Sequence, residues 1–171
     1  MRKLRLGRTG LTVAAQGFGA LPIQRTAEAE AIRILRNAFD GGIDYFDTAR
    51  YYTDSEEKLG KALSDVRDKL YIATKTFAKT GDELRRDLET SLSLLKTDYI
   101  DVYQFHNPPF VPRPGGEDGL YDAALEAQRK GQIRFIGITN HRLALAKVLV
   151  AMYSLSLTSD NALPSFSSLS V

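Results

Sequence analysis

Short apolar runs alternate with amphipathic helical segments along most of this chain of 171 residues. Strands are expected at 13–20, 43–49, 70–76, 99–106 and 133–139. A helical segment follows each run, and no hairpin signal separates one unit from the next. Strands that alternate with helices in this way imply a parallel sheet flanked by helices. The fold class is therefore α/β, and both the doubly wound fold and the (β/α)8 barrel fit the pattern.

Capping residues and breakers mark the ends of the helices. The candidate N-caps are Thr26, Asp54 or Ser55, Thr80 or Asp82, and Asn140. Gly41 and Gly42 end the first helix, and the proline-rich segment 107–118 is expected to be a loop. The opening KLRLGRTGLTV reads as a small hairpin that turns at residues 8–10 and precedes the first strand.

The composition excludes several classes of protein. Lysine and arginine number 23 against 21 acidic residues, so a dedicated nucleic-acid or membrane-surface protein is not expected. The absence of cysteine excludes disulfides, thiolate metal sites and a cysteine nucleophile from this chain. The start lacks the apolar core of a signal peptide, and no run approaches about 18 apolar residues. We therefore expect a cytoplasmic protein without a metal site.

Polar side chains stand at the carboxyl ends of four consecutive expected strands, where parallel α/β proteins gather their chemistry. They are Asp47, Lys75, His106 and the pair Thr139 and Asn140, with Tyr52 in the loop after Asp47. An unpaired ammonium after an apolar run is costly, so we expect Asp47 to pair with Lys75. Tyr52 then comes within reach of Lys75.

These residue types suit the transfer of a hydride to a carbonyl carbon. An ammonium beside a phenol favours the phenolate, so Tyr52 next to Lys75 can act as general acid at a carbonyl oxygen. His106 can hydrogen-bond the same oxygen and orient it. Together these groups would stabilise the alkoxide that develops as hydride arrives.

Each of these residues also has a purely structural interpretation. Asp47 could cap a strand end, and Lys75 could extend its ammonium to water. Tyr52 could simply pack, His106 could satisfy loop backbone, and Asn140 is a good N-cap in any case. The functional interpretation is favoured because all of these residues fall on the same rim.

The sequence resembles the aldo/keto reductase superfamily of (β/α)8 barrels over residues 1–147. The most specific match is GGIDYFDTARYYTDSEEKLGKAL, which has a tyrosine five residues after the aspartate of FDTA. LGRTGLTVAAQGFGALP, ATKT, DYIDVYQFHNP and GQIRFIGITNH match further motifs in order. These motifs are similar to those of a bacterial and archaeal branch of the family. Members of that branch often have a C-terminal extension that binds an iron–sulfur cluster, and a chain without cysteine cannot hold such a cluster.

The resemblance implies the roles of the strand-end residues. Asp47, Tyr52, Lys75 and His106 align with the catalytic tetrad, with Tyr52 as general acid. Thr139 and Asn140 align with a Ser-Asn pair that holds the nicotinamide carboxamide, and threonine keeps the hydroxyl. The implied cofactor is NADPH, and the implied substrate is a small aldehyde or ketone.

The resemblance also implies that the barrel is incomplete. A (β/α)8 domain has typically about 250 residues, and no counterpart is found for the later strands that complete the family's cofactor site. Residues 148–171 carry only one of the 44 charged side chains and are rich in serine, so they form an atypical tail. We interpret this tail as the product of a frameshift or of a truncated gene. The upstream nucleotide sequence tests this, since one of its frames should restore a sixth strand.

Two alternatives to an active reductase follow. An incomplete barrel leaves exposed strand edges, so the chain is expected to self-associate and could be inactive or impaired. A regulatory binding module, such as the ion-channel subunits among relatives of this fold, is the third hypothesis. Nothing in the sequence selects it.

Overall fold

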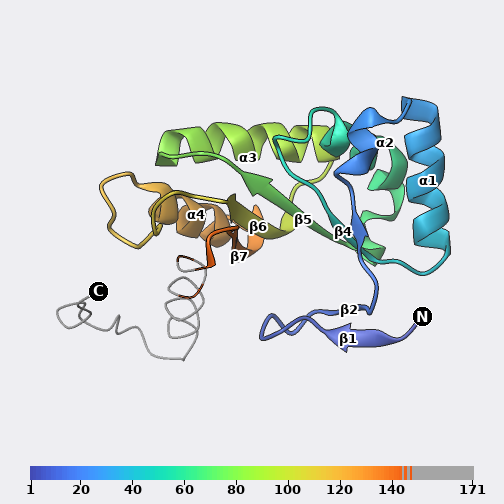
Figure 1. Cartoon of the computed structure of the whole chain (residues 1–171), viewed down its shortest axis with the longest axis horizontal. Coiled ribbons are helices and arrows are strands. Elements are labelled where there is room, and N and C mark those ends of the chain that lie inside the picture. Colours follow the sequence, from blue (N-terminus) through green and yellow to red (C-terminus); the bar gives the residue numbers. More distant parts are fainter. Residues whose placement is uncertain (144, 146, 148–171) are drawn as a thin grey trace.

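The computed structural model describes residues 1–143, 145 and 147 (Figure 1). The strands are β1 (Lys3–Arg5), β2 (Thr12–Ala14), β3 (Phe18–Gly19), β4 (Tyr45–Asp47), β5 (Tyr71–Thr76), β6 (Ile100–His106) and β7 (Ile133–Thr139). The α-helices are α1 (Glu28–Asp40), α2 (Ser55–Leu63), α3 (Gly81–Leu95) and α4 (Leu120–Arg129). Two 3-10 helices, η1 (Pro22–Arg25) and η2 (Ser64–Lys69), complete these elements.

The five strands β3 to β7 form one parallel sheet in the order of the chain. Each new strand adds beside the previous one, whereas a doubly wound sheet reverses its order at a switch point. Right-handed crossovers with this order place every connecting helix on the same face. The fold is therefore of the (β/α)8 barrel type, as the resemblance implied. Among the described residues, β7 pairs with β6 alone, so the barrel is incomplete.

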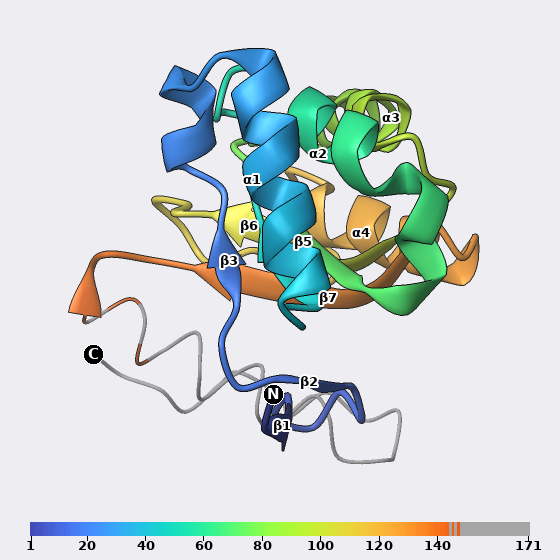
Figure 2. The ribbon, with the colours of Figure 1, turned by 90° about the vertical axis from the view of Figure 1, so that its right-hand side faces the viewer.

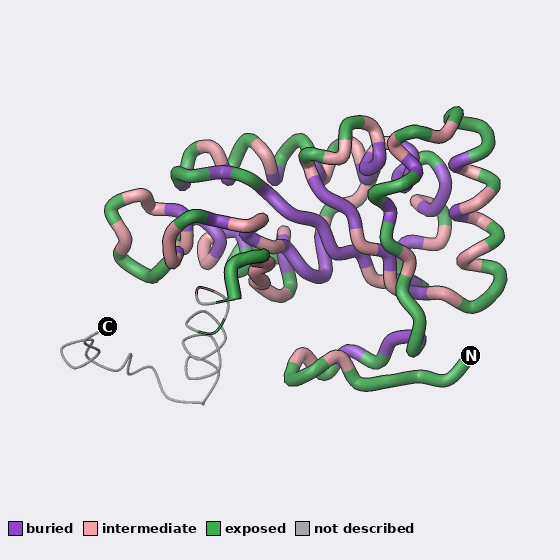
Figure 3. The backbone as a smooth tube through the Cα atoms, viewed as in Figure 1, coloured by how far each residue is buried: buried purple, intermediate pink, exposed green. Residues whose placement is uncertain are grey.

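The helices stand side by side along the sheet. Helix α1 packs beside α2, α2 beside α3, and α3 beside α4 (Figure 2). Their apolar faces and the outward side chains of the strands form the core, which includes Leu35, Phe46, Leu59, Leu84 and Ile100, each fully buried. Figure 3 shows this burial along β5 and β6 and on the inner sides of the helices. Packing of this kind provides the main driving force for such a fold.

The opening hairpin lies at the end of the sheet opposite to the candidate site. Strands β1 and β2 pair in antiparallel fashion, as expected. Asp44, which directly precedes β4, binds Lys3 and accepts a hydrogen bond of 2.6 Å from the Ala14 amide. These contacts attach the hairpin to the amino end of the sheet.

The single strand expected at 13–20 was wrong. The structure divides this segment between β2, which belongs to the hairpin, and β3, which joins the parallel sheet. The apolar run therefore contributes to two separate sheets. At Gly17, between the two strands, a Cβ atom would lie 3.2 Å from Cδ1 of Tyr45, so glycine permits this close approach to β4.

The N-cap expected at Thr26 was also wrong. Ala27 occupies the N-cap of α1 and makes no side-chain capping bond. The Thr26 amide instead donates a hydrogen bond of 3.0 Å to the Ile23 carbonyl at the end of η1. The Thr26 carbonyl accepts a hydrogen bond of 2.7 Å from the Lys58 ammonium. The 3-10 turn and the buried lysine thus fix this corner without a capping hydroxyl.

Other expected boundaries agree with the structure. Thr80 caps α3 by accepting from the Glu83 amide, and α1 ends before Gly41. Asp54 holds the N-cap position of α2 without a side-chain capping bond. Most of the helix expected after Asn140 and the whole tail 148–171 lie outside the described residues. Within the described part of the chain, no helix is long and apolar enough to span a bilayer.

Candidate active site

The carboxyl ends of β4 to β7 meet at one rim, as the sequence predicted. In the register of the sheet, Lys75 lies beside Gln104, and His106 beside Thr139. Alternate side chains of a strand point to the same face, so Lys75, Gln104 and His106 share the inner face of the sheet. The predicted residues therefore gather in one place.

Lys75 and Asp47 form the ion pair that the sequence predicted. The Lys75 ammonium binds Oδ1 of Asp47 and donates to the Thr48 carbonyl at 2.8 Å. Its side chain is 7% exposed, so the alternative of a lysine reaching into water does not describe it. A buried ammonium needs such partners to remain charged.

Of two adjacent tyrosines, Tyr52 faces this ion pair. The Lys75 ammonium lies 5.2 Å from the centroid of the Tyr52 ring. Tyr51 is 73% exposed and packs instead on Phe77, with ring centroids 4.8 Å apart. The structure therefore distinguishes the two phenols, with Tyr52 beside the ammonium and Tyr51 turned outward.

His106 completes the cluster from β6. Its ring meets Tyr52 edge-on and stacks on Phe77 at 4.2 Å between centroids. Burial, reinforced by the positive charge of Lys75, lowers the pKa of His106 to about 4. The imidazole is therefore neutral at pH 7. Its Nδ1 is buried and has no hydrogen-bond partner among the described residues.

Thr139 ends β7 and Asn140 directly follows it, and the two residues have different surroundings. The Thr139 hydroxyl is buried and has no hydrogen-bond partner in the described part of the chain. Asn140 donates to the Pro108 carbonyl at 2.9 Å and accepts from the Arg142 amide at 2.8 Å. The nitrogen and the oxygen of the Asn140 side-chain amide thus both hydrogen-bond to nearby backbone groups, which agrees with the capping interpretation.

Two buried polar residues at the start of α2, Ser55 and Glu56, hold the loop that carries Tyr52. Ser55 donates to the Ala20 carbonyl at 3.0 Å. Glu56 is 1% exposed and binds both Arg50 and Thr74. The sequence marks Ser55 as a candidate N-cap and the Ser-Glu pair as part of a family motif, but it gives Glu56 no role of its own. Charged residues at the start of a helix are ordinary, so no local pattern distinguished the buried Glu56 from a solvated one.

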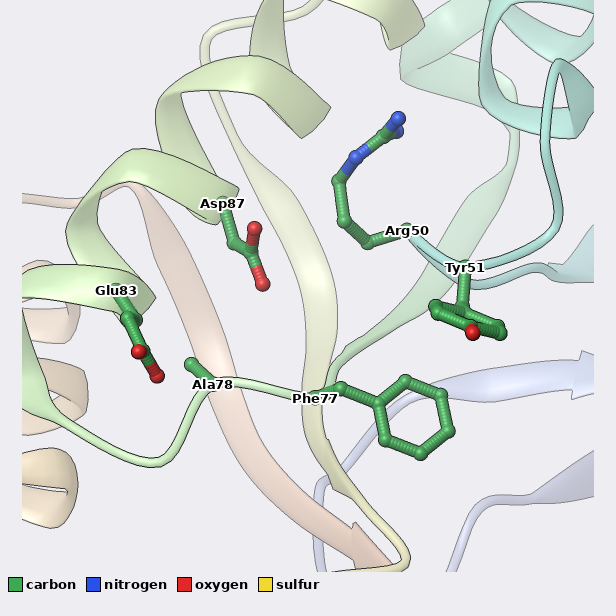
Figure 4. Close-up of a pocket in the computed structure, with 6 residues that line it drawn as sticks. All are labelled: Arg50, Tyr51, Phe77, Ala78, Glu83 and Asp87. Carbon is green, nitrogen blue, oxygen red and sulfur yellow. The ribbon is translucent and has the colours of Figure 1, made fainter.

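A pocket of about 320 Å³ opens beside the cluster (Figure 4). Its lining residues are Arg50, Tyr51, Phe77, Ala78, Glu83 and Asp87. Phe77 forms a common wall, because its ring borders this pocket and also stacks on His106. In Figure 4 the carboxylates of Glu83 and Asp87 come from α3, opposite the aromatic pair. Across the described residues, no group of three potential ligands could hold a metal ion.

A model of the Aldo/keto reductase family matches residues 15–162. The chain belongs to this family. The fold is therefore part of an aldo/keto reductase barrel.

Individual proteins also resemble the chain. L-galactose dehydrogenase of Arabidopsis thaliana is 37% identical over 153 residues, which cover 78% of this chain and 47% of that protein. An aldo-keto reductase from Bacillus halodurans, solved in its holo form, has a TM-score of 0.78 and 31% identity, covering 88% of this chain and 54% of that one.

A further structural relative was solved with a nicotinamide cofactor. The aldo-keto reductase from Klebsiella pneumoniae, in complex with NADPH, has a TM-score of 0.73 and 28% identity. The match covers 84% of this chain and 51% of that one. The chain spans about half the length of the relatives that it matches.

Proposed function

We propose that this chain carries the catalytic residues for nicotinamide-dependent reduction of a small aldehyde or ketone to an alcohol. The proposal rests on one observation. The Lys75 ammonium lies between the Asp47 carboxylate and the Tyr52 ring, and His106 meets the same tyrosine edge-on. This arrangement supplies a proton donor, a cation beside it and a neutral hydrogen-bonding group.

Tyr52 would donate the proton to the carbonyl oxygen. The positive charge of Lys75 stabilises the negative charge that develops on the phenolate, and Asp47 holds Lys75 in place. His106, neutral at pH 7, has one ring nitrogen able to donate to the same oxygen. Two donors at one oxygen stabilise the alkoxide of the transition state.

The proposed cofactor is NADPH, which supplies the hydride when bound. The buried Thr139 hydroxyl, with no partner in the described part of the chain, fits a group that receives the nicotinamide carboxamide. Asn140 would join it by exchanging one of its backbone partners for the cofactor. NADPH in the Klebsiella pneumoniae relative supports the choice.

The test compares turnover by the wild type with that of two tyrosine variants. Tyr52→Phe should reduce kcat by roughly 10²–10⁴-fold, the usual contribution of a general acid. Tyr51→Phe is the matched control, because Tyr51 is 73% exposed and its ring packs on Phe77. Equal activity of the two variants would reject Tyr52 as the proton donor.

The open sheet supports a second candidate, an inactive or impaired barrel that self-associates. Within the described residues β7 has a strand partner on one side only, and most of its side chains are partly exposed. An unpaired edge can bind another strand. Size-exclusion chromatography with a dye for apolar surface tests this, since a monomer that binds no dye would exclude it. The cytoplasmic location remains a prediction.

A further inference from the structure

Gln104 lies on the inner face of the sheet, among the residues of the candidate site. It is beside Lys75 on β5 and beside Gly137 on β7 in the register of the sheet. Its position two residues before His106 directs both side chains to the same face. The sequence pattern alone gives Gln104 no role.

The two carboxylate oxygens of Asp47 have different partners, Lys75 at one and the Gln104 amide at the other. Lys75 binds Oδ1, and Gln104 donates from Nε2 to Oδ2 at 3.3 Å. With only Lys75 bound, the carboxylate could turn about its terminal torsion, which is broad in aspartate. The second hydrogen bond restricts this rotation and fixes Oδ1 toward the ammonium.

Gly137 provides the space that this arrangement needs. A Cβ atom at this position would lie 2.9 Å from Cγ of Gln104 and 3.3 Å from Cγ1 of Val102. The first distance is shorter than real contacts of this kind, so a side chain here would displace Gln104. The glycine on β7 therefore leaves the room that the glutamine side chain on β6 occupies.

We propose that Gln104 is a positioning residue for the reaction. It orients Asp47, which holds Lys75 against Tyr52. The inference rests on the proposed function for its catalytic meaning, but the chain of contacts from Gln104 to Lys75 can be measured without turnover. Gln104 itself touches no reacting atom and acts through Asp47.

Gln104→Met tests the proposal, because methionine keeps the length of the side chain and removes its amide. We expect kcat to fall about tenfold, since a hydrogen bond to a charged group is lost, while KM stays within about twofold. The matched control is Gln128→Met, whose amide donates to the Arg134 carbonyl on the exposed side of the chain. This control should behave as the wild type.

The signal of the Lys75 ammonium in a nitrogen–proton NMR spectrum gives a readout independent of activity. Hydrogen bonds to Asp47 and the Thr48 carbonyl should keep its protons visible in the wild type and in Gln128→Met. In Gln104→Met the signal should broaden or vanish. Lys75→Arg identifies the signal by removing it.

Gly137→Ala reaches the same contacts from the other strand and serves if Gln104→Met does not fold. It leaves the amide present but displaced, so the Lys75 signal should broaden here as well. An unchanged Lys75 signal in either folded variant would overturn the proposal, even if kcat fell. A wild type without turnover would reject the proposed function, whereas the NMR result would still decide the role of Gln104.

Discussion

The rings of Tyr52 and His106 meet nearly at a right angle, at 85°, with their centroids 5.9 Å apart. One ring comes from the loop after β4 and the other from the end of β6, so the sheet brings together residues 54 positions apart in the sequence. Two polar groups converging from different elements suit a single substrate oxygen. Phe77 stacks on His106 and keeps its ring in this orientation.

The lowered pKa of His106 predicts how stability depends on pH. Burial and Lys75 lower the pKa to about 4 in the folded state, from an ordinary value of 6.5. Between about pH 6.5 and pH 4 the unfolded chain binds a proton that the folded chain does not, so stability falls as pH falls through this range. Above pH 6.5 the residue contributes no such dependence.

Thermal unfolding from pH 7 to pH 4 measures this effect in the wild type and in His106→Gln. The melting temperature of the wild type should fall more steeply toward pH 4 than that of the variant. His141→Gln, at an exposed position, is the control; it removes the smallest of the contributions that lower the pKa of His106 and should keep the steep fall of the wild type. Parallel curves for all three proteins would show that His106 is not protected from protonation.

Lys58 is predicted to be a major stabilising residue. Its side chain is 4% exposed and its ammonium contacts Asp54 at 2.8 Å and the carbonyls of Ile23 and Thr26 at 2.9 and 2.7 Å. Lys58→Met should reduce the free energy of unfolding by about 2–3 kcal/mol, because it leaves these acceptors without a donor. Denaturant unfolding measures this loss.

The matched control for Lys58→Met lies three residues further along α2. Lys61 also binds acidic partners, Glu28 and Glu57, but its side chain is 31% exposed. Lys61→Met should therefore have a much smaller effect, since water solvates the groups left behind. A comparable loss in both variants would contradict the special role of the buried lysine.

Gly60 is predicted to be required for the contact between α2 and α3. A Cβ atom there would lie 2.1 Å from the Leu94 carbonyl oxygen and 2.8 Å from the Leu95 carbonyl carbon. Because these are backbone atoms, the helices would have to separate. Gly60→Ala should destabilise the protein by at least about 2 kcal/mol despite the better helix propensity of alanine.

Gly19→Ala provides the comparison for Gly60→Ala. A Cβ atom at Gly19 meets nothing within 4 Å, so this variant should retain the unfolding midpoint of the wild type. If Gly60→Ala were equally stable, α2 and α3 would not approach as closely as the structure has them.

The periodic parts of the fold could be predicted from the sequence. Strands such as β5 and β6 are apolar and bounded by breakers, and α3 has leucines at helical spacing behind a capping Thr80. The segment 13–20 was misassigned because a single apolar run serves two sheets, which depends on contacts with Asp44 and β4. Such contacts are not encoded locally.

Part of the candidate site could also be predicted from the sequence, and part could not. Asp47, Lys75 and His106 stand at strand ends, so topology alone places them on one rim. Gln104 and Glu56 were missed because their importance depends on what lies opposite them, an aspartate oxygen in one case and Arg50 with Thr74 in the other. A physical reason to choose Tyr52 over Tyr51 comes only from the structure. The Tyr52 ring lies beside the Lys75 ammonium, whereas Tyr51 is exposed.

The most direct test of the account is a fluorescence titration of NADPH into the full chain, followed by addition of a small aldehyde. We predict saturable binding, and then consumption of NADPH in proportion to the alcohol formed. Thr139→Val should weaken the binding, because it removes the buried hydroxyl proposed to receive the carboxamide. A chain that shows no saturable binding and consumes no NADPH would contradict the claim that this site reduces carbonyl compounds.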